Sequence, residues 1–86
     1  MKIIDLLEKL LDDDTNIEIQ NEINNLEIKN LEEILMNLNH YFSDSDIRAK
    51  DKNYKLFQNE ELKKLIRYLK SNDIKRANEI SFLQKS

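Results

Sequence analysis

The chain's one histidine is the first residue to consider for chemistry. His40 is followed by Tyr41, and Asp44 lies four residues after it, a spacing that places two side chains on one face of a helix. An aspartate in that position can orient an imidazole for general acid–base catalysis. No nucleophile accompanies the pair, however, and a helix C-terminus also favours a cationic residue. We therefore predict that the protein is not an enzyme, and a small enzyme using His40 ranks third among the functions considered.

Two aspartate-rich stretches have the alternating spacing with which calcium-binding loops begin. One starts at Asp12 and the other at Asp44. The first has Ile17 where the loop needs glycine and Ile23 where it needs a bidentate glutamate, and the second continues with Arg48, which repels a cation. Helix capping explains both stretches better, so we predict no metal site.

Residue types that are missing exclude several other functions. The chain contains no cysteine, glycine, proline or tryptophan. Without cysteine it can form neither a disulfide framework nor a cysteine-based zinc site. Without glycine it cannot form the glycine-rich loops that bind phosphates. We therefore expect no cofactor and see no signature of a small-molecule substrate.

A third polar group lies on an otherwise apolar stripe. Asp51, Tyr54 and Gln58 are spaced three and four apart, which places them on one helical face between Ile47 and Leu62. A carboxylate buried there needs a hydrogen-bond donor. Candidates for this donor are Arg48, Tyr41 or a side chain from the first two helices. We expect a satisfied polar layer that fixes helix register, and the alternative is an uncovered stripe that forms a partner or dimer seam.

The polar-layer interpretation also ranks two substitutions. Asp51→Ala should strand the donors of a buried carboxylate and cost about 1–3 kcal/mol. Gln58→Leu should be milder, and even stabilising if the partners of its amide can reach water. On the sequence alone, Asp51 is therefore the more important residue of the two.

Charge is distributed unevenly along the chain. Residues 1–46 contain twelve acids and three bases, a net charge of −9, and residues 47–86 contain eleven bases and five acids, a net charge of +6. The simplest interpretation is that acidic and basic helices pack side by side, with weak ion pairs along their rims.

The acidic half also suggests a protein-binding surface. A basic partner could dock on a concentrated negative rim, which would steer association, made of Asp12, Asp13, Asp14, Glu18 and Glu22. Small acidic helical proteins that neutralise basic nuclease toxins bind in this way, and this chain is like them in size and charge only. A non-catalytic interaction module, with an immunity- or antitoxin-like or adaptor role, is our first choice of function.

The basic half suggests nucleic-acid binding as the alternative function. Its exposed and roughly co-facial bases would be Arg48, Lys52, Lys55, Lys63, Arg67 and Lys70. Glu60 and Glu61 interrupt this run, and the sequence pI of about 5.1 is acidic, whereas dedicated nucleic-acid domains are usually basic.

Apolar periodicity predicts a single domain, an all-α bundle of four to five short helices spanning residues 1–86. The expected helices cover residues 3–11, 17–26, 31–42, 46–70 and 74–83, with an alternative break near Gln58. Thr15 begins a capping-box pattern and Asn30 a second cap signal. Some asparagines should replace the missing glycines at positive φ.

The predicted core places one face of the third helix against the fourth. From the third helix it contains Leu31, Ile34, Leu35, Leu38 and Phe42, and from the fourth Leu62, Leu65 and Leu69.

The first helix is apolar over a wide arc. A monomer of this size can hardly cover both of its sides, and a large exposed apolar patch usually marks an interface. We therefore predict a homodimer or a protein partner at Ile3, Ile4, Leu7 and Leu11. No apolar run approaches the ~18 residues of a membrane span, and no secretion signal is evident. A soluble, cytoplasmic protein is expected.

Overall fold

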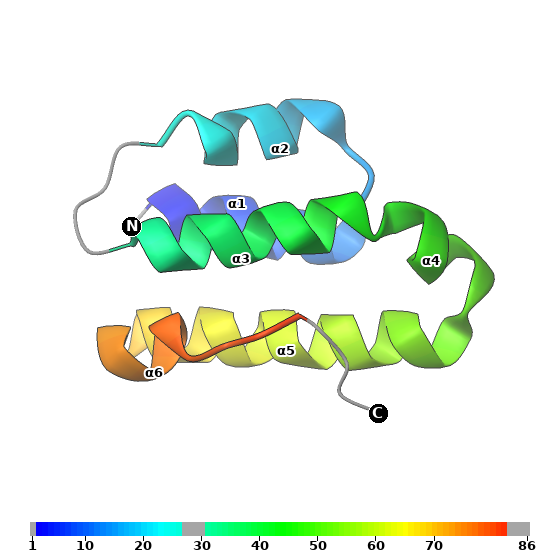
Figure 1. Ribbon diagram of the computed structural model, residues 1–86. Coiled ribbons are helices and arrows are strands. Elements are labelled where there is room, and N and C mark those ends of the chain that lie inside the picture. Colours follow the sequence, from blue (N-terminus) through cyan, green and yellow to red (C-terminus); the bar gives the residue numbers. More distant parts are fainter. Residues whose placement is uncertain (1, 27–30, 83–86) are drawn as a thin grey trace.

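The computed structural model describes residues 2–26 and 31–82, and all regular structure in these ranges is helical (Figure 1). Six helices are present there: α1 Lys2–Asp12, α2 Ile17–Asn24, α3 Glu32–Ser43, α4 Ser45–Lys50, α5 Lys52–Lys70 and α6 Ile74–Asn78. The predicted all-α bundle is confirmed. In the same ranges, no helix combines the length and the hydrophobicity needed to cross a membrane.

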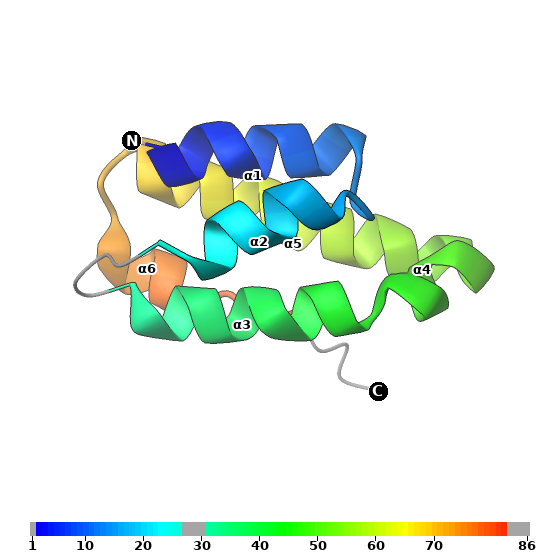
Figure 2. The same cartoon turned by 90° about the horizontal axis from the view of Figure 1, so that it is seen from above.

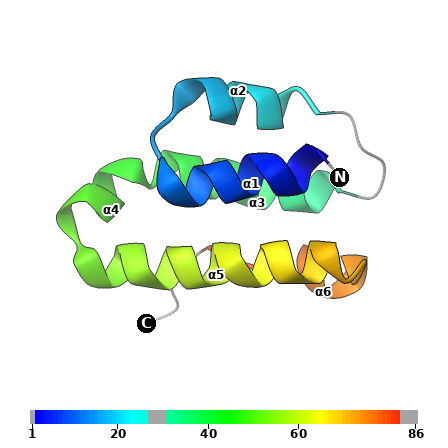
Figure 3. The same cartoon turned by 180° about the vertical axis from the view of Figure 1, so that it is seen from behind.

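The helices lie in three levels. Figures 1 and 3 show α2 on one side of the molecule, α1 and α3 in the middle, and α5 with α6 on the opposite side. Seen from above, α2 lies over the space between α1 and α3 (Figure 2). Helix α5 packs on α1, α4 and α6, whereas α3 packs on α2, α4 and α6. The acidic helix α2 and the basic helix α5 therefore lie on opposite sides of the molecule.

Polar side chains begin three of the helices. Asn16 accepts the backbone N–H of Ile19 at 3.2 Å and caps α2, so Asn16 and not Thr15 is the capping residue. Asp73 caps α6 by accepting the N–H of Arg76 at 3.2 Å. The cap signal at Asn30 lies outside the described residues.

The region 46–70 is divided, but not near Gln58. The helical path is interrupted at Asp51, whose backbone is extended, with φ −121° and ψ 104°. Its carboxylate accepts the N–H groups of Asn53 and Tyr54 at 3.0 and 3.1 Å, and these bonds begin α5. Residues 45–50 thereby form a separate short helix, and no break occurs at Gln58.

The turn after α5 uses asparagine where glycine is usual. Asn72 has a φ of 59°, in the left-handed region. The N–H of Asp73 donates to the carbonyl of Tyr68 at 2.8 Å, and the N–H of Asn72 donates to that of Leu69 at 3.1 Å. These two hydrogen bonds form a Schellman motif, which satisfies carbonyls that the end of the helix leaves free. The expectation that asparagine replaces glycine is confirmed at this position.

The chain after α6 does not continue as a helix to Leu83. Helix α6 ends at Asn78, and residues 79–82, here called the C-terminal strap, run back along α5 (Figure 1). Ile80 and Phe82 in the strap are buried. Leu83 lies outside the described residues. Phe82 is thus a core residue that the helical pattern missed.

The core contains most of the expected residues, with two changes. Leu31, Ile34 and Leu38 are buried, whereas Leu35 and Phe42 are only half-buried. The three expected leucines of α5 are also buried, but α5 packs closely on α1, α4 and α6 and not on α3. Tyr41 is fully buried in the α3 contribution to the core.

Helix α1 is covered within the chain. Ile3, Leu6, Leu7 and Leu10 are all buried, and Ile4 and Leu11 are half-buried against the same core. Helices α2 and α5 together cover its wide apolar arc. The premise of an uncovered first helix is therefore wrong, and Ile3 and Leu7 are not available as an interface.

Leu38→Ala should cost about 2–5 kcal/mol of unfolding free energy, because it removes a fully buried side chain and leaves a cavity. Leu35→Ala is the matched control on the same helix. It should cost clearly less, because Leu35 is only half-buried and its truncation removes less apolar surface from the core. Urea unfolding of both variants measures the difference. Equal losses would contradict the burial assigned to α3.

Candidate functional site

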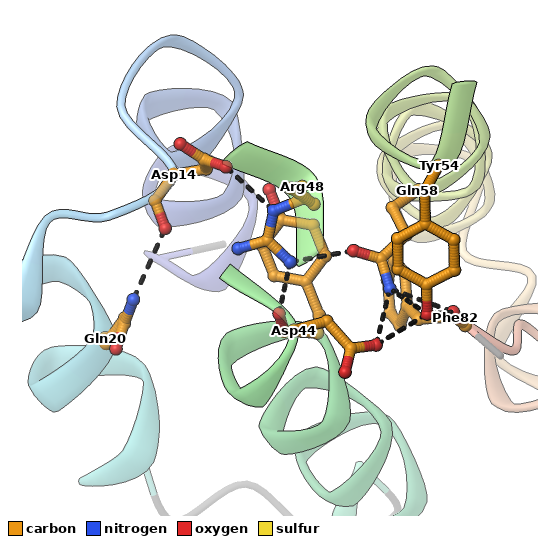
Figure 4. Close-up of polar contacts among 8 residues, drawn as sticks. Asp14, Gln20, Asp44, Arg48, Tyr54, Gln58 and Phe82 are labelled. Carbon is orange, nitrogen blue, oxygen red and sulfur yellow. Dashed lines mark hydrogen bonds and ion pairs between the residues drawn. The ribbon is translucent and has the colours of Figure 1, made fainter. Parts of the chain in front are cut away.

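Arg48 is a basic side chain that α4 carries into the interior. It is 2% exposed, and its guanidinium carbon lies 3.8 Å from the centre of the Tyr41 ring. Nε donates to Oδ2 of Asp14 at 2.8 Å, and Nη1 donates to Oε1 of Gln58 at 2.7 Å and to the carbonyl oxygen of Tyr41 (Figure 4). The buried cation thereby connects the α1–α2 loop, α3 and α5.

Gln58 extends this cluster to the C-terminal strap. Its Nε2 donates to Oδ2 of Asp44 at 2.9 Å and to the carbonyl oxygen of Phe82 at 2.9 Å (Figure 4). The Tyr54 hydroxyl donates to the same Asp44 oxygen at 2.7 Å and lies 3.4 Å from the Phe82 carbonyl. We call this set the Arg48 cluster; its members are Asp14, Tyr41, Asp44, Arg48, Tyr54 and Gln58.

The charges and pKa values of the Arg48 cluster are those expected of a group that stabilises the fold. Asp14, whose side chain is 21% exposed, faces the guanidinium and offsets part of its desolvation cost. Burial raises the pKa of Tyr41 to about 12, although the nearby Arg48 charge opposes that shift. Burial, followed by the hydrogen bond to Asp44, raises the pKa of Tyr54 to about 12 as well. Both tyrosines therefore stay neutral at physiological pH.

Two polar atoms of the Arg48 cluster have no hydrogen-bond partner among the described residues. They are Nη2 of Arg48 and the hydroxyl of Tyr41, both buried. An unmet buried donor costs stability. Most polar atoms of the Arg48 cluster therefore have hydrogen-bond partners, but these two do not.

The predicted polar layer is correct for Tyr54 and Gln58 and wrong for Asp51. Asp51 is exposed and acts as the N-cap of α5. The carboxylates that contact these residues and Arg48 are those of Asp44 and Asp14. From the sequence, Asp44 is predicted to cap a helix and Asp14 to belong to the acidic rim. The candidate donor Arg48 does take part, but it binds Asp14 and Gln58.

The acidic rim is mostly at the surface. Asp12, Asp13, Glu18 and Glu22 are exposed, and none of them forms an ion pair within residues 2–26 and 31–82. Asp14 differs, because it is committed to Arg48 at 2.8 Å. Ile17, at the start of α2, is 68% exposed beside these acids.

The basic candidates separate into one buried and five exposed residues. Arg48 is buried, so its assignment to an exposed nucleic-acid face is wrong. The exposed residues all lie on α5: Lys52, Lys55, Lys63, Arg67 and Lys70. Lys63 pairs with Glu60 and Lys70 with Glu8, each at 3.5 Å.

The two charged halves are only sparsely joined. Within the described ranges, the ion pairs between them are Arg48 with Asp14 and Lys70 with Glu8. The other three ion pairs are local contacts between residues three apart in the C-terminal half. Mutual neutralisation therefore accounts for little of the charge asymmetry.

His40 does not form the arrangement considered for catalysis. It is exposed in the last turn of α3, where a cationic residue is favourable. Asp44 accepts from Tyr54 and Gln58 of α5 instead. In the described part of the chain, no group of three or more acidic or histidine side chains is placed to hold a metal ion.

A shallow pocket of about 290 Å³ lies between α5 and α6. Its lining consists of Glu61, Lys64, Tyr68, Arg76, Glu79 and Ile80. Lys64 pairs with Glu61 at 3.2 Å, so two of its charges already neutralise each other. The lining is strongly polar, unlike the mainly apolar pockets that bury small ligands.

Comparison with models of known protein families, with curated protein sequences and with solved structures finds no match for this chain. Function must therefore be argued from the residues and their placement.

Arg48→Met should lower the unfolding free energy by about 2–4 kcal/mol, because Asp14 and Gln58 lose their shared donor in the interior. Lys50→Met is the matched control: the side chain is on the same short helix but exposed, and its effect should stay within about 0.5 kcal/mol. Chemical unfolding of the two variants decides the point. Similar values for both would mean that the Arg48 cluster adds nothing to stability.

The structure reverses the expected order of two further substitutions. Gln58→Leu should cost about 1–3 kcal/mol or more, because Arg48, Asp44 and the strap all lose a partner. Asp51→Ala should cost about 0.5–2 kcal/mol, as loss of a helix cap, and Asp51→Ser should restore most of it. Thermal melts of the three variants test this. Failure of serine to rescue would argue against capping.

Proposed function

We propose that this chain is a non-catalytic, cytoplasmic protein-interaction module that docks a basic protein through the acidic rim. The observation that carries the proposal is that Asp12, Asp13, Glu18 and Glu22 are exposed on and beside α2, without ion pairs in the described ranges. Such unpaired charge raises association rates with an oppositely charged surface.

The geometry of α2 supports the same proposal. Glu18 and Glu22 are four residues apart, so they share one side of the helix. Exposed Ile17 adds an apolar contact next to them. A partner with a basic surface and a small apolar depression fits this combination. An immunity- or antitoxin-like role would use such a surface, and so would an adaptor.

Nucleic-acid binding remains the second candidate. It is favoured by the five exposed bases of α5, a helix on the side of the molecule opposite α2 (Figure 1). Two of the five are paired with acids, and Glu60 lies within the run. Because phosphate contacts are carried by unpaired lysine and arginine, this surface is weaker than the acidic rim.

A comparative pull-down tests the proposal. The native protein and the variant Glu18→Gln/Glu22→Gln are used as bait in nuclease-treated lysate, with Glu32→Gln/Glu33→Gln as a charge-matched control. Glu32 and Glu33 are also exposed but lie in the first turn of α3. We expect a basic protein that the native chain and the control retain and the rim variant loses.

Two results would contradict this function. Equal capture by the rim variant and the control would show that the acidic rim is not the docking surface. Capture that occurs in a parallel untreated lysate but not in the nuclease-treated one, and that falls in Lys55→Gln/Arg67→Gln, would instead assign the protein to nucleic-acid binding.

A further inference from the structure

The C-terminal strap lies in the structure as a bound peptide would. Ile80 and Phe82 are 7% and 1% exposed, whereas Ser81 between them is exposed. Inward side chains two residues apart, with an outward one between, are characteristic of an extended segment. The Phe82 ring packs on Tyr41 of α3, with ring centres 5.2 Å apart.

Side chains of two helices hold the strap by its main chain. Nδ2 of Asn37, on α3, donates to the carbonyl oxygen of Ile80 at 2.9 Å. Nε2 of Gln58, on α5, donates to the carbonyl oxygen of Phe82 at 2.9 Å. Contacts of this kind bind any extended backbone, so sequence preference comes from the buried side chains.

Gln58, one of the two residues that hold the strap, has partners outside the strap. Gln58 is oriented by Arg48 at 2.7 Å and by Asp44 at 2.9 Å, neither of which belongs to the strap. Helix α3 also packs on α2 and α4, and α5 on α1 and α4. The Gln58 donor and the two helices that flank the strap are therefore pre-organised, which lowers the cost of binding.

We propose that the seam between α3 and α5 is a peptide-binding groove, filled here by the chain's own strap. Its external ligand is an extended segment of a partner protein with an aliphatic residue two positions before an aromatic one, the pattern of Ile80 and Phe82. The tethered strap competes at an effective concentration on the order of millimolar, so it holds the groove closed against weak ligands. This groove is separate from the exposed acids Asp12, Asp13, Glu18 and Glu22 through which docking is proposed, and its test involves none of them.

A labelled peptide tests the groove. The probe is a fluorescein-labelled peptide with the sequence of residues 78–84, and the receptors are the full native chain and the full-length variant Ile80→Ser/Phe82→Ser, whose strap has lost its apolar anchors. Fluorescence anisotropy should show binding to the variant that is about tenfold or more tighter than to the native chain, where the strap competes. A peptide with alanine at the position of Phe82 should not bind.

The clamp residue gives the matched control. Adding Asn37→Ala to the anchor-free variant should weaken the peptide severalfold, whereas adding Asn39→Ala, an exposed neighbour on α3, should not. Equal affinity for the native chain and a folded anchor-free variant, or no binding to that variant, would overturn the proposal. If circular dichroism shows the double variant unfolded, Phe82→Ala replaces it. Should Phe82→Ala unfold as well, the strap is an integral part of the core and the groove does not exist.

Discussion

The guanidinium of Arg48 is the constraint on which the arrangement of the helices depends. A buried cation needs acceptors around it, and these come from parts of the chain that are far apart in sequence. Asp14 is 34 residues away, in the loop before α2, and Gln58 is ten residues away on α5. Because each acceptor must reach the same group, α3, α4, α5 and the α1–α2 loop are held in one relative position.

That constraint also explains how the strap is attached. The side-chain carbonyl of Gln58 accepts from Arg48, and its amide donates to Asp44 and to the Phe82 carbonyl. One side chain therefore links the guanidinium to the C-terminal strap. Hydrogen bonds in a low-dielectric interior reinforce such chains. The strap thereby lies at a defined place between α3 and α5 although it has no regular secondary structure.

The charge asymmetry of the sequence becomes a spatial one. Asp14 and Arg48 pair inside, whereas the exposed acids Glu18 and Glu22 lie on α2 and five exposed bases lie on α5, two helices at opposite sides of the molecule (Figures 1 and 3). Exposed charges that are far apart are screened from one another at physiological ionic strength. The acids of α2 and the bases of α5 therefore do not neutralise one another.

The sequence alone determined the helical class, most of the α3 core positions, and the use of asparagine in place of glycine in left-handed turns, which the structure shows at Asn72. These features depend on residues within a few positions of each other, since helical periodicity and turn geometry are local. Only the tertiary structure decided that Arg48 is buried, that Asp44 rather than Asp51 serves the polar layer, and that Phe82 belongs to the core. A charged residue on a short helix is exposed by default, and its burial follows from partners that packing brings from 34, ten and seven residues away.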